Sequence, residues 1–210
     1  AEALAESRPQ SPVPWNLKGL AYLGQDRPQE AERAFRKALA RGPGDPAASH
    51  NLAALLRRQG RPEAARELYR EVLQRKPDNL PTLVALARLD MDAGRRDAAR
   101  RTLRKAIDAH PDATGARALL ARLERYAGNP RRALTIARKG RGLLPSEPAL
   151  LEQAGRAYLA LGEAPAAEGA FRRWLDEHPE SPTGRYLLGR ALAVQGELGE
   201  AEQAVDRAIA

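Results

Sequence analysis

The chain has 210 residues, of which 43% are apolar and 30% are charged, and its formal net charge is +8. It contains no Cys, which excludes disulfides, thiolate metal ligands and thiol nucleophiles. No apolar run approaches the roughly 18 residues that a membrane-spanning helix needs, so the sequence predicts no membrane span. Aromatic residues make up only 4% of the chain, which favours a core of Leu and Ala between closely set helices.

A proline recurs at a constant spacing along the whole chain. The period is 34 residues, and the prolines are Pro9, Pro43, Pro77, Pro111, Pro145 and Pro179. A fixed period of roughly 20 to 50 residues is typical of a stacked repeat protein. A frame that starts at Pro12 predicts repeats over residues 12–45, 46–79, 80–113, 114–147, 148–181 and a truncated sixth over 182–210. Residues 1–11 are predicted as the tail helix of a preceding repeat, so we expect one continuous array that extends beyond both ends.

Each repeat has the apolar pattern of two amphipathic helices. In the first repeat Trp15, Gly19 and Tyr22 share one helical face, and Ala31 and Phe35 share the face of a second helix. A glycine at position 15 of the later repeats predicts the end of the first helix, in a left-handed conformation. These glycines are Gly60, Gly94, Gly128, Gly162 and Gly196. The sequence therefore predicts an all-α fold of antiparallel helix pairs.

These residues resemble the tetratricopeptide repeat, with Lys18 in place of the Leu of its Leu-Gly pair. The fifth repeat recovers Gly155, Tyr158, Ala167, Phe171 and Pro179. The resemblance implies a right-handed superhelical solenoid of 34-residue units. It also implies a non-enzymatic scaffold for protein–protein interactions, which binds a partner on a concave groove lined by the first helix of each repeat.

The same resemblance places candidate partner-binding residues along that groove. Position 9 of four successive repeats is an arginine, namely Arg88, Arg122, Arg156 and Arg190. The other candidates are Arg57, Arg58, Arg125, Asn16, His50, Asn51, Tyr126 and Tyr186. Guanidinium groups match the geometry of carboxylates, so the expected partner is an acidic protein or peptide segment. Alternatively, these arginines are solvated charges that pair within their own helix, as Glu152 could pair with Arg156.

Positive charge is concentrated in the middle repeats. Residues 46–147 carry 22 Lys and Arg against 11 Asp and Glu. Such a surface steers acidic partners and could bind RNA or another polyanion, which is the alternative function. No row of aromatic residues accompanies the arginines, so we do not expect specific nucleic-acid recognition.

The sequence predicts no catalytic residue, no cofactor and no metal site. The histidines His50, His110 and His178 lack the spacing of metal ligands. Asp90 and Asp92 are two residues apart on a helix, point apart, and are predicted to lie on a solvated face. The array could still recruit substrates for a larger enzyme. Trp174 is predicted to fill core space near Leu188.

Residues 80–210 also resemble, more loosely, bacterial repeat arrays of exopolysaccharide assembly. That resemblance implies a periplasmic or cell-envelope location and a partner in an export complex, with a cytoplasmic location as the alternative. Inter-repeat faces at both ends of the array predict end-to-end self-association.

Overall fold

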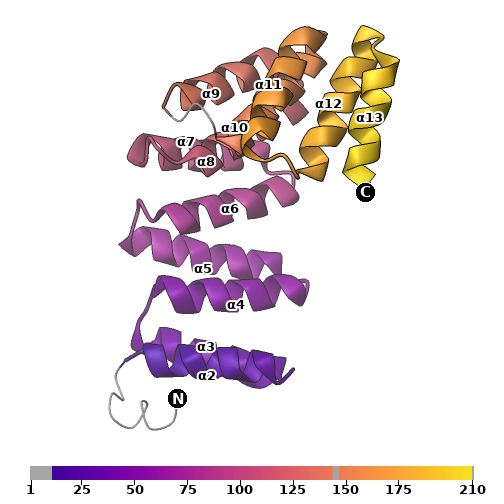
Figure 1. Ribbon diagram of the computed structural model, residues 1–210. Coiled ribbons are helices and arrows are strands. Elements are labelled where there is room, and N and C mark those ends of the chain that lie inside the picture. Colours follow the sequence, from indigo (N-terminus) through magenta and orange to yellow (C-terminus); the bar gives the residue numbers. More distant parts are fainter. Residues whose placement is uncertain (1–10, 144–146, 210) are drawn as a thin grey trace. The chain divides into compact units, whose positions relative to one another are not determined.

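The chain is an all-α protein in this computed structural model, which describes residues 11–143 and 147–209, without the side chains at 140–143. Within those residues there are twelve helices and no strand (Figure 1). They are α2 (Val13–Gly24), α3 (Pro28–Arg41), α4 (Pro46–Arg58), α5 (Pro62–Arg75), α6 (Leu80–Asp92), α7 (Arg96–Ala109), α8 (Thr114–Tyr126), α9 (Pro130–Leu143), α10 (Pro148–Ala160), α11 (Ala164–Glu177), α12 (Pro182–Gln195) and α13 (Leu198–Ile209). The predicted tail helix over residues 1–11 lies outside the described residues, apart from Ser11.

Helices that are neighbours in sequence pack against one another, as a helical repeat solenoid requires. The pairs α2–α3, α4–α5, α8–α9, α10–α11 and α12–α13 are in contact, and α3–α4, α5–α6, α9–α10 and α11–α12 join one pair to the next. The chain forms two compact units, Ala1–Ala106 and Ile107–Ala210, which we call the N-terminal and C-terminal units. The predicted fold class, a helical repeat solenoid, is confirmed.

The turn after the first helix of each pair depends on a residue with left-handed backbone. Gly60, Gly94 and the later glycines of this position have φ between 71° and 84°, as the sequence predicted. In the first repeat the same position is Asp26, with φ of 55°. A non-glycine residue in this conformation is strained, because its Cβ approaches the following carbonyl oxygen.

Replacing Asp26 with Gly is therefore expected to stabilise the N-terminal unit. The relieved strain is about 1–2 kcal/mol, and the greater freedom of glycine in the unfolded chain offsets about 0.5–1 kcal/mol of it. Thermal unfolding of the Asp26→Gly variant should show a small rise in Tm. A fall in Tm would show that the Asp26 side chain stabilises the folded state by more than its backbone strain destabilises it.

Small and large side chains face each other inside the helix pairs. A Cβ atom placed on Gly19 would lie 2.3 Å from Cε1 of Phe35, and one on Gly155 would lie 2.4 Å from Cε1 of Phe171. The glycines thus let the aromatic ring of the second helix lie directly on the backbone of the first. Trp174 is 8% exposed and shares a core cluster with Leu188, which confirms its predicted place in the core.

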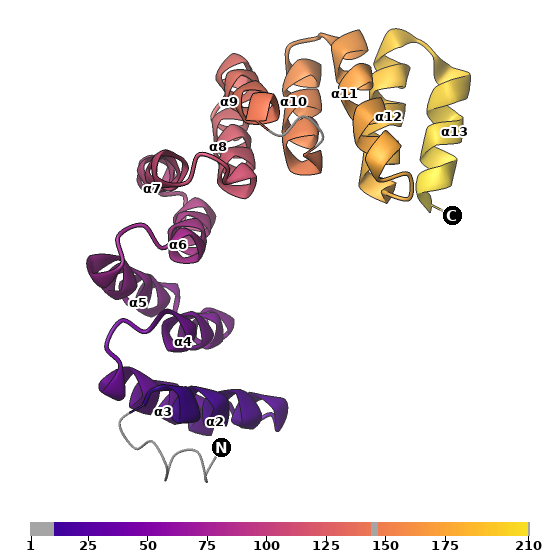
Figure 2. The same cartoon turned by 60° about the vertical axis from the view of Figure 1, so that its left-hand side comes forward.

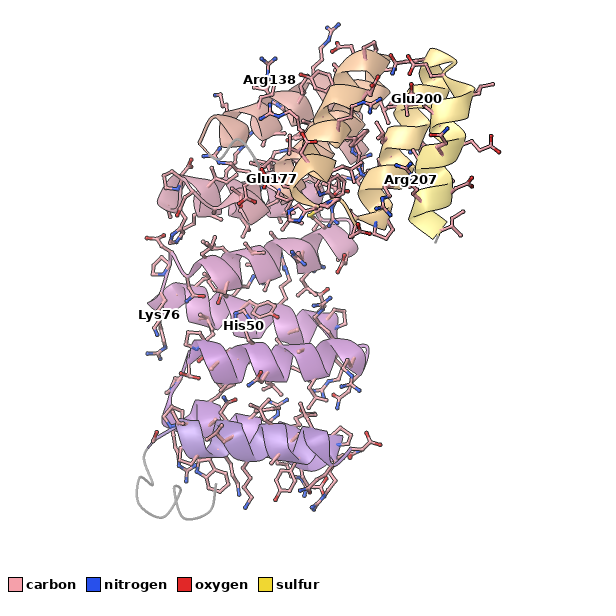
Figure 3. The ribbon with its side chains drawn as sticks, in the orientation of Figure 1. His50, Lys76, Arg138, Glu177, Glu200 and Arg207 are labelled. Atoms are coloured by element: carbon pink, nitrogen blue, oxygen red, sulfur yellow. The ribbon has the colours of Figure 1, made fainter. Side chains whose placement is uncertain are left out.

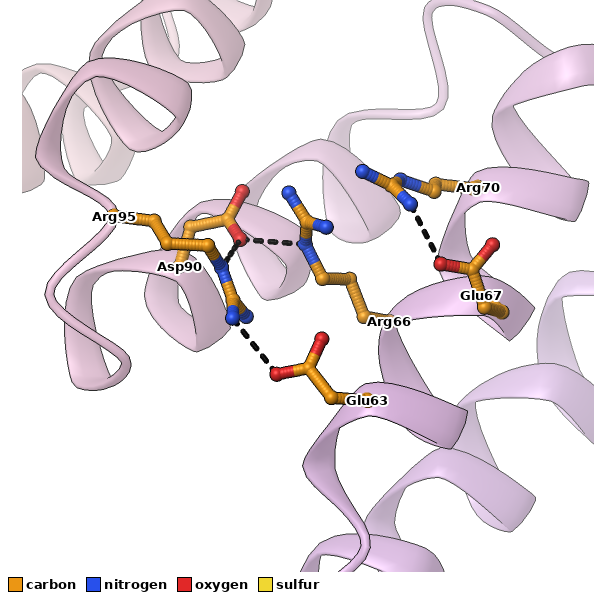
Figure 4. A network of polar contacts seen from close by, with 6 residues as sticks. All are labelled: Glu63, Arg66, Glu67, Arg70, Asp90 and Arg95. Carbon is orange, nitrogen blue, oxygen red and sulfur yellow. Dashed lines mark hydrogen bonds and ion pairs between the residues drawn. The ribbon is translucent and has the colours of Figure 1, made fainter.

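One predicted surface residue is instead buried. Asp90 was expected on a solvated face, but it lies in the interior of the N-terminal unit. Its Oδ1 accepts hydrogen bonds from Nε of Arg66 at 2.7 Å and Nε of Arg95 at 2.8 Å, and Arg95 also donates to Glu63 (Figure 4). The prediction was wrong because Asp90 is at position 11, a core position of the repeat, where two arginines from neighbouring segments neutralise the carboxylate.

Candidate functional site

The C-terminal unit carries most of the predicted arginine ladder. Its first helices are neighbours, since α10 contacts both α8 and α12 (Figure 2). Arg122 on α8 and Arg190 on α12 form no ion pair with any described residue. Arg156 on α10 does: its Nε donates to Oε1 of Glu152 at 2.8 Å. The alternative of pairing within the helix thus holds for Arg156, while Arg122 and Arg190 keep their charge available.

An exposed tyrosine lies among the arginines of this unit. Tyr126 is 65% exposed, and the Arg125 guanidinium lies 4.3 Å from the centre of its ring. A hydrogen bond from Arg125 lowers the pKa of Tyr126, and the charges of Arg156 and Arg122 lower it further. Nε of Arg125 is buried and has no hydrogen-bond partner among the described residues. The positive potential here therefore favours an anion over a neutral group.

Helix α12 also carries an exposed tyrosine and an exposed arginine. Tyr186 is 50% exposed and lies four residues, or about one helical turn, before the exposed Arg190. We call the set Arg122, Arg125, Tyr126, Arg156, Tyr186 and Arg190 the arginine face of the C-terminal unit. It combines hydrogen-bond donors in a fixed fork with aromatic rings that can cover apolar surface, and Glu152 is its one paired acid.

In the N-terminal unit the predicted site residues divide into two groups. Asn51 donates to Asn16 across the α4–α2 contact at 2.9 Å, and His50 Nε2 lies 2.8 Å from Oγ1 of Thr82 on α6. These three side chains are therefore engaged in holding successive first helices together.

Arg57 pairs with Asp92 at 3.6 Å, whereas no ion pair is found for Arg58 or Arg88 within the described part of the unit.

The hydrogen bonds around His50 show that its Nε2 carries a proton. Oγ1 of Thr82 donates its one hydrogen to Oδ1 of Asn79 at 2.6 Å, so it must accept from Nε2–H of His50. Burial lowers the pKa of His50. Nε2–H of His50, which Figure 3 labels, therefore donates to Thr82, and the centre of its ring lies 5.1 Å from that of Tyr69. These contacts give His50 a structural role.

The sequence matches models of the tetratricopeptide repeat over residues 16–79, 118–182 and 152–210, and a further model of the same repeat over residues 56–123. The chain belongs to the tetratricopeptide repeat family. This confirms the resemblance that the packing residues indicated. None of the curated proteins matches the sequence.

Solved tetratricopeptide repeat structures share the fold at low sequence identity. A tetratricopeptide repeat protein of Parabacteroides merdae is 18% identical, with a TM-score of 0.77 over 95% of this chain and 79% of that one. PilF of Pseudomonas aeruginosa is 20% identical, with a TM-score of 0.74 over 94% and 90% of the two chains. A thermophilic tetratricopeptide repeat protein of Thermus thermophilus is 19% identical, with a TM-score of 0.63 over 87% and 100%.

Tetratricopeptide repeats serve as scaffolds for protein–protein interaction, and they are in general not enzymes. Among the described residues no group of three or more acidic or His side chains is placed to hold a metal ion. A bilayer-spanning helix is likewise not found in the residues that the structure describes.

Proposed function

We propose that this tetratricopeptide array binds an acidic segment of a partner protein on the arginine face of the C-terminal unit. The observation that supports it is the environment of Tyr126. The Arg125 guanidinium lies over this exposed ring, and the charges of Arg122 and Arg156 help to lower the pKa of Tyr126. A carboxylate there would receive charge-assisted hydrogen bonds from guanidinium donors, and the ring would cover the apolar part of the same segment. Arg88, Arg57 and Arg58 of the N-terminal unit form a second, weaker candidate face.

The roles within the arginine face differ. Arg122 and Arg190 have no carboxylate partner among the described residues, so binding an acidic group breaks none of the ion pairs seen there. Arg156 would have to share its guanidinium with Glu152. We therefore assign most of the binding free energy to Arg122 and Arg190, and a smaller part to Arg156.

Peptide binding by matched variants tests this assignment. A short labelled peptide rich in Asp, Glu and Leu should bind the chain, and Arg122→Ala with Arg190→Ala should weaken it about tenfold or more. The control is Arg131→Ala with Arg138→Ala, which removes the same charge from exposed positions of α9. Affinity measured by fluorescence anisotropy should change little in this control. Equal losses in the two double variants would show that only net charge matters and would contradict the proposal.

The looser resemblance of residues 80–210 to exopolysaccharide-assembly arrays leads us to propose a cell-envelope location and a partner in an export complex. Fractionation of a bacterial host, followed by cross-linking in the envelope fraction, tests it. Recovery of the chain from the cytoplasmic fraction alone would contradict this part of the proposal and leave the peptide measurement unaffected.

A further inference from the structure

The helices α8, α9 and α10 have few acidic residues to balance their arginines. Residues 114–160 contain three, namely Glu124, Glu147 and Glu152. Glu124 is buried and pairs with Arg132 of α9 at 3.9 Å, and Glu152 binds Arg156 at 2.8 Å. Arg122 and Arg125 of α8 form no ion pair with any described residue. These two guanidinium groups therefore keep positive charge that the described part of this unit does not pair.

This charge is gathered around Tyr126, the last residue of α8. Arg122 lies four residues, or about one helical turn, before Tyr126, and the guanidinium of the adjacent Arg125 lies 4.3 Å from the centre of its ring. A hydrogen bond from Arg125 lowers the pKa of Tyr126 most, and the charges of Arg156 and Arg122 lower it too. Guanidinium groups from two neighbouring helices thus act on one exposed hydroxyl group. We call Arg122, Arg125, Tyr126 and Arg156 the Tyr126 cluster.

The Arg125 guanidinium is held by an aromatic ring and not by a carboxylate. Its Nε is buried and has no hydrogen-bond partner among the described residues. A cation–π contact restrains the guanidinium plane and leaves its charge unneutralised. An anion at the Tyr126 cluster would therefore meet a donor that is already oriented, and would break none of the ion pairs seen for the described residues of α8.

The net charge of the cluster selects between classes of anion. Arg122, Arg125 and Arg156 bring three positive charges and the paired Glu152 one negative charge, which leaves an excess of two. A carboxylate carries one negative charge and two oxygens. A phosphate monoester carries about 1.5–2 negative charges near pH 7 and three acceptor oxygens. The phosphate group therefore matches the excess charge of the cluster, whereas one carboxylate compensates half of it.

Two carboxylates of one segment would match the cluster less well. Because the three guanidinium groups act on a single hydroxyl, the attraction is largest for an anion whose charges are concentrated at one point. Side chains on one face of an extended segment are two residues, or roughly 6–7 Å, apart. One carboxylate of such a segment can lie at Tyr126 while the next lies beyond it.

We propose, on the basis of the function proposed above, that the partner segment carries a phosphorylated residue and that its phosphate group binds at the Tyr126 cluster. Arg122 and Arg125 donate to the phosphate oxygens, and Arg156 contributes through its charge. Arg190 of α12 binds an acidic side chain of the same segment. The partner is thus a phosphoprotein, recognised by one dianionic group together with neighbouring carboxylates.

Three labelled peptides of otherwise identical sequence test this assignment. Each carries Glu and Leu around one variable position, which is phosphoserine, Asp or Ser. In fluorescence anisotropy at fixed ionic strength, the phosphoserine peptide should bind about tenfold or more tightly than the Asp peptide, and the Ser peptide more weakly than both. Equal affinities for phosphoserine and Asp would overturn the phosphate site and leave the binding of acidic segments intact. Failure of all three peptides to bind would contradict both proposals.

Variants locate the preference for phosphate, measured as the ratio of the Kd for the Asp peptide to the Kd for the phosphoserine peptide. Arg122→Ala with Arg125→Lys removes one donor and replaces the planar fork of the other by a single ammonium group, and should bring the ratio close to one. Arg190→Ala should weaken both peptides and leave the ratio unchanged. The control is again Arg131→Ala with Arg138→Ala on α9. An unchanged ratio in Arg122→Ala with Arg125→Lys would overturn the proposal.

The pH dependence of binding tests the proposal without any substitution. Phosphoserine loses its second proton with a pKa of about 6, whereas Asp is ionised throughout the range from about pH 5.5 to 7.5. Binding of the phosphoserine peptide should therefore tighten as the pH rises through this range, and binding of the Asp peptide should stay constant. The charged and titratable groups on the described helices packed here face both peptides alike, and they are Arg122, Glu124, Arg125, Tyr126, Arg132, Glu152, Arg156, Tyr186 and Arg190. Parallel pH profiles for the two peptides would overturn the proposal.

Competition with single-stranded RNA separates a phosphopeptide site from general attraction to phosphate. RNA presents phosphodiesters, each with one negative charge, and binds mainly through the summed charge of a surface. The phosphoserine peptide should resist displacement by RNA more than the Asp peptide does. Displacement of both peptides by the same RNA concentration would show contact with general positive charge and would count against the proposal.

Discussion

Replacing Phe171 with Ala is expected to lower the free energy of unfolding of the C-terminal unit by about 3–5 kcal/mol. The ring of Phe171 is fully buried and lies on Gly155. Because glycine has no side chain, nothing on that side can move in to fill the cavity that the substitution leaves. Chemical denaturation should show a lower midpoint with little change in slope. Glu177→Ala, an exposed residue at the end of the same helix, is the control and should change stability little (Figure 3).

Hydrogen exchange can locate the effect of Phe171→Ala. Each helix pair contacts only its neighbours, so the loss should be confined mainly to amides of α10, α11 and α12. Amides of α4, in the N-terminal unit, should keep most of their protection. An equal loss of protection in α4 would show that the two units unfold as one.

The second large effect is expected at Asp90. Asp90→Ala leaves Arg66 and Arg95 without the carboxylate to which both donate, in a partly buried setting. Breaking a buried pair in this way costs about 3–5 kcal/mol, and the remaining exposure of the arginine side chains, 15% and 29%, places the expected loss near the lower end, about 3 kcal/mol. Thermal and denaturant unfolding measure it.

The control for Asp90 lies on the same helix. Asp92 is mostly exposed, and its one ion pair within the described residues is with Arg57 at 3.6 Å, so Asp92→Ala should cost less than about 1 kcal/mol. The double variant Asp90→Leu with Arg66→Leu removes the buried charge and one of its partners together, and should recover part of the loss. If Asp90→Ala lowered the free energy of unfolding no more than Asp92→Ala, the buried carboxylate would not stabilise the contact between α5 and α6.

The fold could be predicted from sequence because its determinants are local and periodic. Gly155 and Phe171 lie 16 residues apart in one repeat, as do Gly19 and Phe35, and the same contact follows at each place. Asp90 shows where such reasoning fails. Its spacing from Asp92 indicated a solvated face, whereas its position in the repeat is a core position, and the two arginines that allow its burial lie on other segments.

The candidate site was only partly predictable for the same reason. The pairing of Arg156 with Glu152 follows from a spacing of four residues on one helix. Contacts between repeats, such as Asn16 with Asn51 and His50 with Thr82, join residues 32 or 35 positions apart and cannot be read from a single helical face. The cations around Trp15 were not predicted, because Lys37 and Arg41 reach its ring from the second helix.

The ion pairs between neighbouring repeats also restrict how the repeats can be ordered. Glu32 binds Arg61 of the following repeat at 3.1 Å, and Arg172 binds Glu200 of the next at 3.1 Å. If the fifth repeat were to follow the first, Glu163 would occupy the place of Arg61, and two carboxylates would meet. A permuted chain would keep every residue that defines the family and still carry mismatched junctions. The repeats are therefore not interchangeable, because the charges at each junction match those of one particular neighbour.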